Sequence, residues 1–438
     1  MSKILIFGAG KSATELINYI GSNATHNGWE FTVADAQFEL AEKKVKPFAL
    51  GKAVAVDVTK QEQRLAVIQE ADIVISLLPP SLHIQVARDC IQCKKNLLTA
   101  SYIDTPLREL EKDILDAGLL FLCEMGLDPG IDHMSAMEII HRLKRQGAEI
   151  KSFLSHCGGL VAPESDDNPW HYKISWNPRN IVLAGSAGAV YKENSKIINK
   201  PYSEIFSECH TIKVPGFNPY AWYPNRDSLS YIPVYQLENI PTFIRTTLRH
   251  EDFCRAWNIL VNLGLTNPTD RDTLSQVKTF KEWIELKVSQ TGGNTDWKNY
   301  CAGLSDTIQN QINYLQLDID ESLPGSLMSS ADILQHVIEK KLILGKEDKD
   351  MIIMQHEIAY QLQNENKTLS STLIVKGEDA ERTAMAKTVG LPLGIAAKLI
   401  LEGKIKSTGL KIPIEAEIYE PVLEELKSSG IAFHETIS

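Results

Sequence analysis

A glycine-rich turn lies between a short apolar run and a helix-length stretch at the start of the chain. The run Ile4 to Phe7 is followed by Gly8-Ala9-Gly10-Lys11-Ser12-Ala13, and a helix is predicted from about Ser12 to Ile20. The glycines permit a tight bend and let the backbone approach a phosphate, and the small Ala13 lets helix and strand pack closely. The helix N-terminus adds unpaired N–H donors. This context favours a dinucleotide-binding unit over a purely structural glycine turn.

β-branched runs alternate with polar, helix-length stretches up to about residue 100. The alternation is typical of a doubly wound parallel sheet, so we predict an α/β fold with a Rossmann domain over residues 1–125. The runs are Lys3 to Phe7, Phe31 to Ala34, Ala53 to Asp57, Ile73 to Leu78, Asn96 to Ala100 and, after a helix over Pro106 to Ala117, Leu119 to Cys123.

The pattern changes after about Glu149. Strand-like runs come first, at Ser152 to Cys157, Asn180 to Ala184 and Lys213 to Val214, and return at Met351 to Ala359 and Thr372 to Val375. Helical periodicity fills the interval, at Phe253 to Leu263, Asp272 to Val288 and Ala331 to Leu342, and ends the chain, at Ala380 to Glu402 and Ile418 to Ser428. We predict a mixed α/β domain of 126–250 and 345–438, whose C-terminal segment is able to pack back on the Rossmann domain, with an all-helical domain of 251–344 inserted into it.

Composition and charge narrow the class of protein. Apolar residues make up 43% and charged residues 23%, which are ordinary values for a folded soluble chain. Lys plus Arg number 45 against 56 Asp plus Glu, a net charge of −11, and the basic residues are not segregated along the chain. Such an acidic excess repels phosphate backbones, so we expect no nucleic-acid partner.

Cysteines and the N-terminus indicate a cytoplasmic protein. The seven cysteines are odd in number and scattered, unlike a secreted disulfide framework. The glycine turn at Gly8 replaces the apolar stretch of a signal peptide, and no apolar run approaches membrane-spanning length, so we expect no membrane partner. No metal site is expected either, because no His-Glu-x-x-His is present and His250 with Cys254 cannot complete a tetrahedral site.

A carboxylate ends the second predicted strand. Asp35 lies 22 residues after Ala13, close to the distance at which an acid accepts hydrogen bonds from the adenosine ribose. It would repel a ribose phosphate, so we predict NAD rather than NADP. The alternative is an aspartate that caps the next helix. Asp57-Val58, at the end of the third strand, has the same two interpretations: a contact with adenine or a helix cap.

Ligands of doubly wound sheets lie outside the carboxyl ends of the strands. Three loops follow such ends: Leu77-Leu78-Pro79-Pro80, Ala100-Ser101-Tyr102 and Gly126-Leu127-Asp128-Pro129-Gly130. A serine, a phenol and a carboxylate that meet there would supply donors and a candidate acid or base. The alternative for Asp128-Pro129-Gly130 is a simple turn.

A second group of candidate residues follows residue 150. His156-Cys157-Gly158-Gly159 places a thiol at a predicted strand end, although a buried inert thiol is the ordinary interpretation. Arginines occur in Tyr223-Pro-Asn-Arg226-Asp-Ser228 and Arg245-Thr-Thr-Leu-Arg249. A guanidinium matches a carboxylate in a bidentate pair, although surface ion pairs are the commoner use of arginine.

These motifs, in this order and over essentially the whole chain, are similar to the saccharopine dehydrogenase family of the glutamate-forming type. The resemblance rests on the glycine turn and on Val74-Ile-Ser-Leu-Leu-Pro79, Thr99-Ala-Ser-Tyr102, Gly126-Leu-Asp-Pro-Gly-Ile-Asp-His-Met134, Cys157-Gly-Gly, Ala162-Pro-Glu164, Tyr223-Pro-Asn-Arg-Asp-Ser228, Thr247-Leu-Arg249 and Ala384-Met-Ala-Lys-Thr-Val-Gly-Leu-Pro392. It implies a Rossmann domain, a mixed substrate-binding and dimerisation domain with a helical insertion, and a homodimer.

The resemblance also implies a reaction in lysine metabolism. The family oxidises saccharopine, with a nicotinamide cofactor and water, to glutamate and 2-aminoadipate 6-semialdehyde, reversibly, through an imine that is hydrolysed. Tyr102, Asp128 and Cys157 match its catalytic candidates. The resemblance assigns these residues to the cofactor site: Gly8, Gly10, Lys11, Ser12, Ala13, Asp35, Asp57, Val58, Leu77, Leu78 and Ala100. It assigns these residues to the substrate site: Ser101, Tyr102, Asp128, Cys157, Gly158, Arg226, Thr247, Leu248 and Arg249. The two arginines are suited to a substrate with three carboxylates.

Two features depart from the family pattern. Ala34-Asp35-Ala36 stands where NADP-using members would carry a basic residue, which again favours NAD. The chain also starts at the first Rossmann strand, so we expect a stand-alone enzyme without a preceding lysine-ketoglutarate reductase domain. The alternatives are a related Schiff-base reductase such as carboxynorspermidine dehydrogenase, and a non-catalytic nucleotide-sensing protein.

Overall fold

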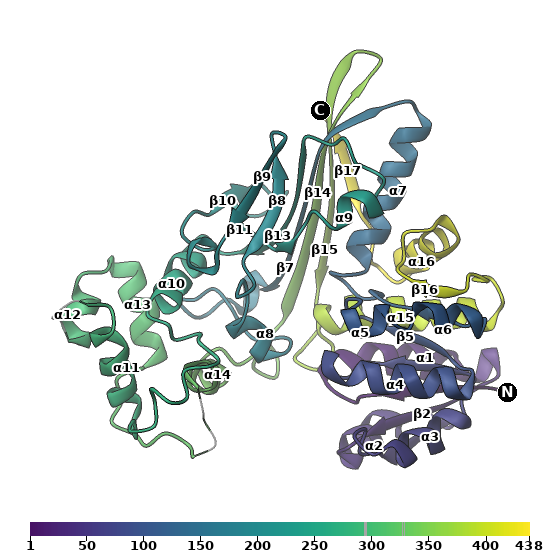
Figure 1. Cartoon of the computed structure of the whole chain (residues 1–438), viewed down its shortest axis with the longest axis horizontal. Coiled ribbons are helices and arrows are strands. Elements are labelled where there is room, and N and C mark those ends of the chain that lie inside the picture. Colours follow the sequence, from purple (N-terminus) through teal and green to yellow (C-terminus); the bar gives the residue numbers. More distant parts are fainter. Residues whose placement is uncertain (293–295, 326, 328) are drawn as a thin grey trace. The chain divides into compact units, whose positions relative to one another are not determined.

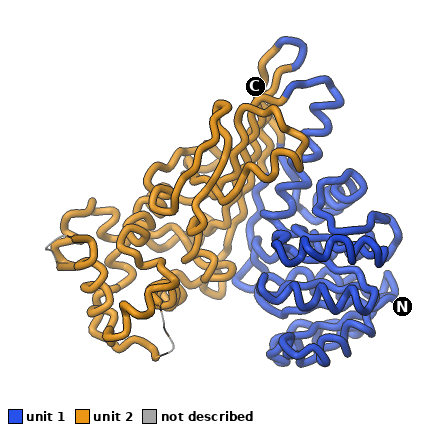
Figure 2. Tube along the Cα trace, viewed as in Figure 1, with its two compact units in different colours: residues 1–149, 362–364, 373–434 blue, residues 150–361, 365–372, 435–438 orange. Residues whose placement is uncertain are grey.

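The computed structural model describes residues 1–292, 296–325, 327 and 329–438. The chain forms two compact units, shown in Figure 2. The first contains residues 1–149, 362–364 and 373–434, and the second contains 150–361, 365–372 and 435–438. The predicted division into three domains stays a prediction.

A seven-stranded parallel sheet forms the first unit. Its strand order is β16-β6-β5-β4-β1-β2-β3, which is the doubly wound Rossmann order with β16 added at one edge. The strands are β16 (Gly409–Lys411), β6 (Leu120–Leu122), β5 (Asn96–Thr99), β4 (Ile73–Ser76), β1 (Ser2–Phe7), β2 (Trp29–Asp35) and β3 (Gly51–Ala55). Each of the six predicted strand runs is observed, and the predicted fold class is confirmed.

Helices cover both faces of this sheet (Figure 1). Leu5 and Phe7 of β1 pack in one cluster with Ile68 and Val86 from helices of one face. The helices of the unit are α1 (Thr14–Asn27), α2 (Phe38–Val45), α3 (Gln61–Gln69), α4 (Pro80–Cys93), α5 (Thr105–Arg108), α6 (Glu111–Asp116), α7 (Ile131–Arg145), α15 (Ala384–Leu401) and α16 (Ala416–Ser428). The short helix η1 (Lys11–Ala13) precedes α1.

Helix α15 packs closely on α1. A Cβ atom on Gly390 would lie 2.7 Å from the backbone nitrogen of Leu16, so glycine is what allows this approach. By length and composition α15 could cross a membrane, so the expectation that no apolar run reaches that length was wrong. Because 72% of it is buried inside the protein, it has the character of a core helix.

A ten-stranded mixed sheet forms much of the second unit. Its main order is β10-β11-β13-β7-β14-β15-β17, and β8, β9 and β12 pair beside it. The strands are β10 (His210–Ile212), β11 (Tyr220–Pro224), β13 (Thr242–Arg249), β7 (Glu149–Val161), β14 (Asp350–Leu362), β15 (Glu365–Lys376), β17 (His434–Ile437), β8 (Ala189–Glu193), β9 (Lys196–Lys200) and β12 (Arg226–Asp227).

The helices of the second unit surround a tryptophan-rich core. Trp170, Trp257 and Trp283 are fully buried in one cluster. The described helices are α8 (Pro178–Val182), α9 (Tyr231–Val234), α10 (Glu251–Asn262), α11 (Phe280–Ser289), α12 (Trp297–Ala302), α13 (Asp306–Leu315) and α14 (Ser330–Lys341), with short turns η2 (Pro163–Ser165) and η3 (Tyr202–Glu204).

Three local predictions were wrong in this unit. The strand expected at Asn180 to Ala184 is helix α8, because Asn177 accepts the Arg179 N–H and Pro178 starts the helix. Lys213 and Val214 follow β10 instead of forming a strand. The helix expected from Asp272 starts only at Phe280, where Thr279 and Glu282 form a capping box.

Candidate functional site

The glycine turn after β1 has the geometry of a phosphate-binding loop. Gly8 has a φ of +100°, and a Cβ there would lie 3.1 Å from the carbonyl oxygen of Leu77. A Cβ on Gly10 would meet nothing within 4 Å, so the backbone there faces open space. The chain enters η1 at Lys11 directly after this turn. An open backbone at a helix start is suited to binding the pyrophosphate of a dinucleotide. The residues of this turn therefore fit a nicotinamide dinucleotide cofactor.

The other residues predicted for the cofactor lie beside this turn along the same sheet edge. Leu77 donates its N–H to the Phe7 carbonyl, which joins the ends of β4 and β1. Ala13 is buried under the turn, and Leu78 and Ala100 follow β4 and β5. Asp57 accepts hydrogen bonds from the Thr59 backbone N–H and hydroxyl, which lower the pKa of its carboxyl. Neither interpretation given above for Asp57-Val58 is shown by this contact, because the N-cap residue of α3 is Lys60.

Asp35 is engaged by the backbone. Its Oδ2 accepts the Ala9 N–H at 2.7 Å, and its Oδ1 accepts the Gln37 N–H at 2.8 Å. Both carboxylate oxygens therefore hold the glycine turn and the start of the next segment. A carboxylate used in this way is an anchor of the loop, and its presence does not require that a ribose hydroxyl be its partner.

A lysine lies beneath the same turn. Nζ of Lys44 donates to the Gly10 carbonyl at 2.6 Å and to Thr14 Oγ1 at 2.8 Å. Burial lowers the pKa of Lys44 to about 8, although Glu381 and Asp35 oppose that shift. Sequence reasoning missed this residue, because nothing local marks which lysine of α2 turns toward the glycines.

Tyr102 and Asp128 meet at the carboxyl end of the sheet. The Tyr102 hydroxyl donates to Oδ1 of Asp128 at 3.3 Å. The loop of Asp128 is closed by Gly130, whose φ is +146°, and a Cβ there would collide with Gly126 at 2.1 Å. A phenol and a carboxylate in contact are able to share and pass a proton. Their catalytic assignment stays a prediction.

A buried histidine holds the neighbouring serine. His83 Nε2 lies 2.8 Å from Ser101 Oγ, and its Nδ1 lies 2.9 Å from Ser76 Oγ. Burial lowers the pKa of His83 to about 4, so the imidazole is neutral near pH 7. His83 was not predicted, and its position in α4 gives no local signal.

In the second unit, predicted substrate residues occupy neighbouring strands. Cys157 of β7 pairs with Thr247 of β13, and Thr247 also pairs with Tyr223 of β11. The strand β7 continues to Val161, so the prediction that Cys157 ends a strand was wrong. A Cβ on Gly158 would lie 2.7 Å from the Leu248 Cβ, which explains the glycine after the thiol.

Arg249, at the end of β13, is a buried cation. It is 3% exposed, its Nη1 donates to the Leu248 carbonyl at 2.7 Å, and its guanidinium lies over the Tyr172 ring at 5.1 Å. Its Nε has no hydrogen-bond partner. Across the described part of the chain, no carboxylate lies within ion-pair distance of it. A buried guanidinium in this state is suited to an incoming carboxylate.

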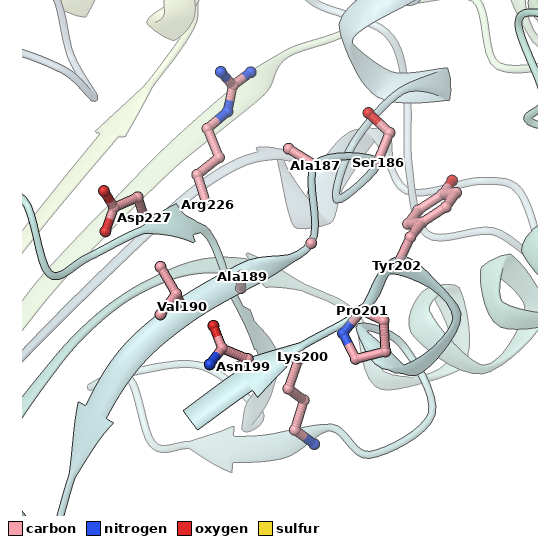
Figure 3. A pocket seen from close by; sticks show the side chains of 11 residues that line it. Ser186, Ala187, Ala189, Val190, Asn199, Lys200, Pro201, Tyr202, Arg226 and Asp227 are labelled. Atoms are coloured by element: carbon pink, nitrogen blue, oxygen red, sulfur yellow. The ribbon is translucent and has the colours of Figure 1, made fainter. Parts of the chain in front are cut away.

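Arg226 lies elsewhere in the second unit, on an open hollow of about 600 Å³ (Figure 3). It is exposed and adopts a φ of 50°. Asp227, Lys200 and Tyr202 also line the hollow, and the guanidinium of Arg226 points away from the Lys200 ammonium in this view.

His171, His250 and Asp252 form a group of potential metal ligands within the described residues. The two imidazole rings are tilted against each other by 31°, with centroids 4.0 Å apart. One ligand atom from each of the three residues lies within 4.8 Å of the others. The expectation that the chain has no metal site is not tested by this arrangement and stays a prediction.

The fold and the glycine loop are those of a dinucleotide-binding protein. Two family models match the chain: the saccharopine dehydrogenase NADP binding domain over residues 4–122, and the saccharopine dehydrogenase C-terminal domain over residues 126–431. The chain belongs to the saccharopine dehydrogenase family, and the resemblance drawn from the motifs is confirmed.

The similar proteins are of two kinds, one about twice as long as this chain and one of similar length. The chain is 37% identical over 448 residues to the mitochondrial alpha-aminoadipic semialdehyde synthase of Rattus norvegicus, covering 99% of this chain and 47% of that protein. It is 32% identical over 437 residues to a Saccharomyces cerevisiae protein named saccharopine dehydrogenase [NADP(+), L-glutamate-forming], covering 97% of this chain and 96% of that one. The chain thus spans about half the length of the first group of relatives.

Two solved structures share the fold of this chain. The apo saccharopine dehydrogenase (L-Glu forming) of Saccharomyces cerevisiae superposes with a TM-score of 0.88 at 31% identity, covering all of both chains. A homospermidine synthase of Legionella pneumophila, at 10% identity and a TM-score of 0.55, covers 100% of this chain and 91% of its own, and shares the fold alone.

The prediction of NAD is contradicted by these comparisons. The fungal relatives are named for NADP, and the matching N-terminal family model is an NADP binding domain. The prediction failed because it assumed that the Asp35 carboxylate faces the ribose, whereas the structure turns both of its oxygens onto the Ala9 and Gln37 N–H groups.

Proposed function

We propose that the chain oxidises saccharopine, with NADP⁺ and water, to L-glutamate and 2-aminoadipate 6-semialdehyde. The single observation that carries the substrate class is Arg249, a guanidinium that is 3% exposed and has no carboxylate partner among the described residues. The names of the full-length fungal relatives support the same substrate. They favour it over the related Schiff-base substrate carboxynorspermidine.

The argument from Arg249 is electrostatic. A buried cation is stable only if an anion or several acceptors replace the water that it has lost. Its Nη1 has a carbonyl partner, whereas its Nε has none, so the fork retains a donor for a ligand. Saccharopine carries three carboxylates, and one of them would complete a charge-assisted pair with this guanidinium.

The two loops of the first unit suit the proton steps. A bound nicotinamide supplies the hydride acceptor. Before hydride can leave, the secondary amine of saccharopine must be neutral, and the Asp128 carboxylate is the base we assign to that proton. Tyr102, at 3.3 Å from Asp128 Oδ1, orients the carboxylate and passes protons onward when water attacks the imine.

The test is the initial rate of nicotinamide reduction with saccharopine, with NADP⁺ and NAD⁺ supplied in parallel. We expect turnover that prefers NADP⁺. In Arg249→Lys the charge stays but the planar fork is lost, and the KM for saccharopine should rise about 10- to 100-fold. Arg255→Lys, at an exposed residue paired with Glu251, is the matched control. Absence of turnover with either nucleotide would refute the proposed reaction.

The free thiols and the family resemblance bear on the compartment and the assembly. We propose a homodimer in the cytoplasm that acts on a small-molecule amino acid without a membrane or nucleic-acid partner. All seven cysteines are free thiols, as expected in a reducing compartment. Light scattering gives the molar mass in solution, and fractionation of the native cells gives the compartment. A monomeric mass would overturn the proposed homodimer, and an organellar location would overturn the proposed cytoplasmic compartment.

A further inference from the structure

We propose that Glu124, His133 and Asp132 form a buried link that holds Tyr102 against Asp128, and that they are positioning residues of the active site. The inference rests on the proposed function, because it assigns these side chains to the two loops that carry the proton steps. None of the three was predicted as a functional residue from the sequence.

Glu124 binds both neighbours of Tyr102. It follows β6 and is 4% exposed. Its Oε1 accepts the Ile103 N–H at 3.2 Å, and its own backbone N–H donates to the Ser101 carbonyl at 3.1 Å. The segment that carries Tyr102 is therefore clamped on each side by one residue.

His133 and Asp132 continue the link to the second loop. Nε2 of His133 lies 2.8 Å from Glu124 Oε2, and its Nδ1 lies 3.7 Å from Asp132 Oδ2. Oδ1 of Asp132 accepts the Gly130 N–H at 2.6 Å. Gly130 closes the turn that begins at Asp128. The chain of contacts thus runs from the Tyr102 segment to the Asp128 turn without leaving the interior.

The backbone of Glu124 indicates that this link serves more than stability. Its φ is 55°, a left-handed conformation that is energetically unfavourable for a residue with a side chain. Buried ionisable groups add a desolvation cost that apolar side chains would avoid. Strain of this kind persists where the surroundings determine it, and it is concentrated at functional sites. The two loops that this arrangement fixes are those of Tyr102 and Asp128.

Three variants test the link. Glu124→Gln keeps the side-chain volume and an acceptor for Ile103, but places an amide against His133. His133→Gln removes the ring that joins the two acids. His141→Gln is the matched control, because His141 lies on the same helix α7 and bonds a different residue, the Tyr419 hydroxyl, at 2.8 Å.

Two readouts separate positioning from loss of fold. In hydrogen exchange by mass spectrometry, Glu124→Gln and His133→Gln should speed exchange in segments 101–103 and 126–131 about 10-fold and leave strand β1 unchanged. In steady-state kinetics, kcat for saccharopine should fall about 10- to 100-fold, while the KM for NADP⁺ changes less than about 2-fold. His141→Gln should change neither.

A double-mutant cycle supplies the decisive comparison. If Glu124 acts through the Tyr102–Asp128 contact, adding Glu124→Gln to Tyr102→Phe should lower kcat by less than about 2-fold more. Independent, multiplying losses would overturn the inference, and so would unchanged exchange in both segments. If the wild type does not turn over saccharopine, the proposed function fails, and the exchange experiment still decides on the link by itself.

Discussion

Nε2 of His83 and Oγ of Ser101 lie 2.8 Å apart, and the other ring nitrogen of His83 contacts Ser76. The ring thereby joins the end of β4 to the residue that precedes Tyr102. A neutral imidazole has one N–H donor and one acceptor, so each nitrogen can match one hydroxyl. The orientation of Ser101 depends on His83 remaining unprotonated.

Acidification should destabilise the protein through His83. Burial lowers its pKa from 6.5 to about 4, so between these pH values the unfolded chain binds a proton that the folded chain does not. The contribution of His83 to the free energy of unfolding is therefore fully present above pH 6.5 and should fall by about 3 kcal/mol toward pH 4. Urea unfolding across this range measures the slope. His83→Gln should reduce it, whereas His26→Gln, at an exposed site, should not; equal slopes in all three proteins would contradict this account.

Asp35 should behave as an anchor of the glycine turn. Removing its carboxylate in Asp35→Ala leaves the Ala9 and Gln37 N–H groups without their acceptor. We expect affinity for NADP⁺ and for NAD⁺ to fall by a similar factor of about 10 or more, measured by titration of nucleotide fluorescence. Asp72→Ala, which removes a carboxylate acceptor from the Lys3 N–H at the other end of β1, is the control. A selective loss of NAD⁺ binding would contradict this account and would indicate that the Asp35 carboxylate contacts the adenosine ribose.

Lys44 should make NADP⁺ binding depend on pH. Its pKa is lowered to about 8, chiefly by burial, so the ammonium beneath Gly10 loses its charge as the pH rises above that value. The KM for NADP⁺ should therefore rise between pH 7 and pH 9 in the wild type. In Lys44→Met it should be about 5-fold higher at pH 7 and nearly flat. Lys43→Met, an exposed neighbour, should retain the wild-type profile.

Gly130 should tolerate no side chain. At a φ of +146°, a Cβ would lie 2.1 Å from the Gly126 carbonyl oxygen, which a backbone shift alone must relieve. We expect Gly130→Ala to lower the free energy of unfolding by ~3 kcal/mol or more and to abolish turnover. Gly147→Ala, at a φ of +81° with open space around it, should cost only about 1 kcal/mol. Denaturant unfolding measures the free energy of unfolding of the two variants. Similar losses would show that the positive φ, and not the contact of the new Cβ with Gly126, determines the cost.

Local signals explain what the sequence could predict. The glycine turn, the six parallel strands and the loops of Tyr102 and Asp128 follow from short-range patterns together with the rule that parallel strands end at one edge. That rule led to the expectation that these two side chains would lie close together. The sequence also indicated Arg249 as a candidate carboxylate-binding residue, although nothing in it showed that the guanidinium would lack a carboxylate partner within the chain.

Features that depend on tertiary packing could not be predicted. Asp35 was read from its spacing, but the direction of its carboxylate is decided by which N–H groups the folded loop offers. His133 lies in the motif from Gly126 to Met134, and Glu124 precedes that motif by two residues, yet their pairing needs a left-handed residue after β6. The helix at Pro178 was mistaken for a strand because an apolar run of that length suits either element when its capping residue is overlooked.

The packing of α15 on α1 has a consequence for synthesis on the ribosome. The surface around Leu16 that Gly390 covers belongs to the start of the chain, whereas its cover is made near the end. At roughly 5–20 residues per second, the interval is on the order of 20 to 75 seconds. During that time the emerging Rossmann segment exposes an apolar helix face to solvent. The first unit is thus begun before the second unit is translated and is completed only after it, so it needs protection from aggregation until α15 and α16 arrive.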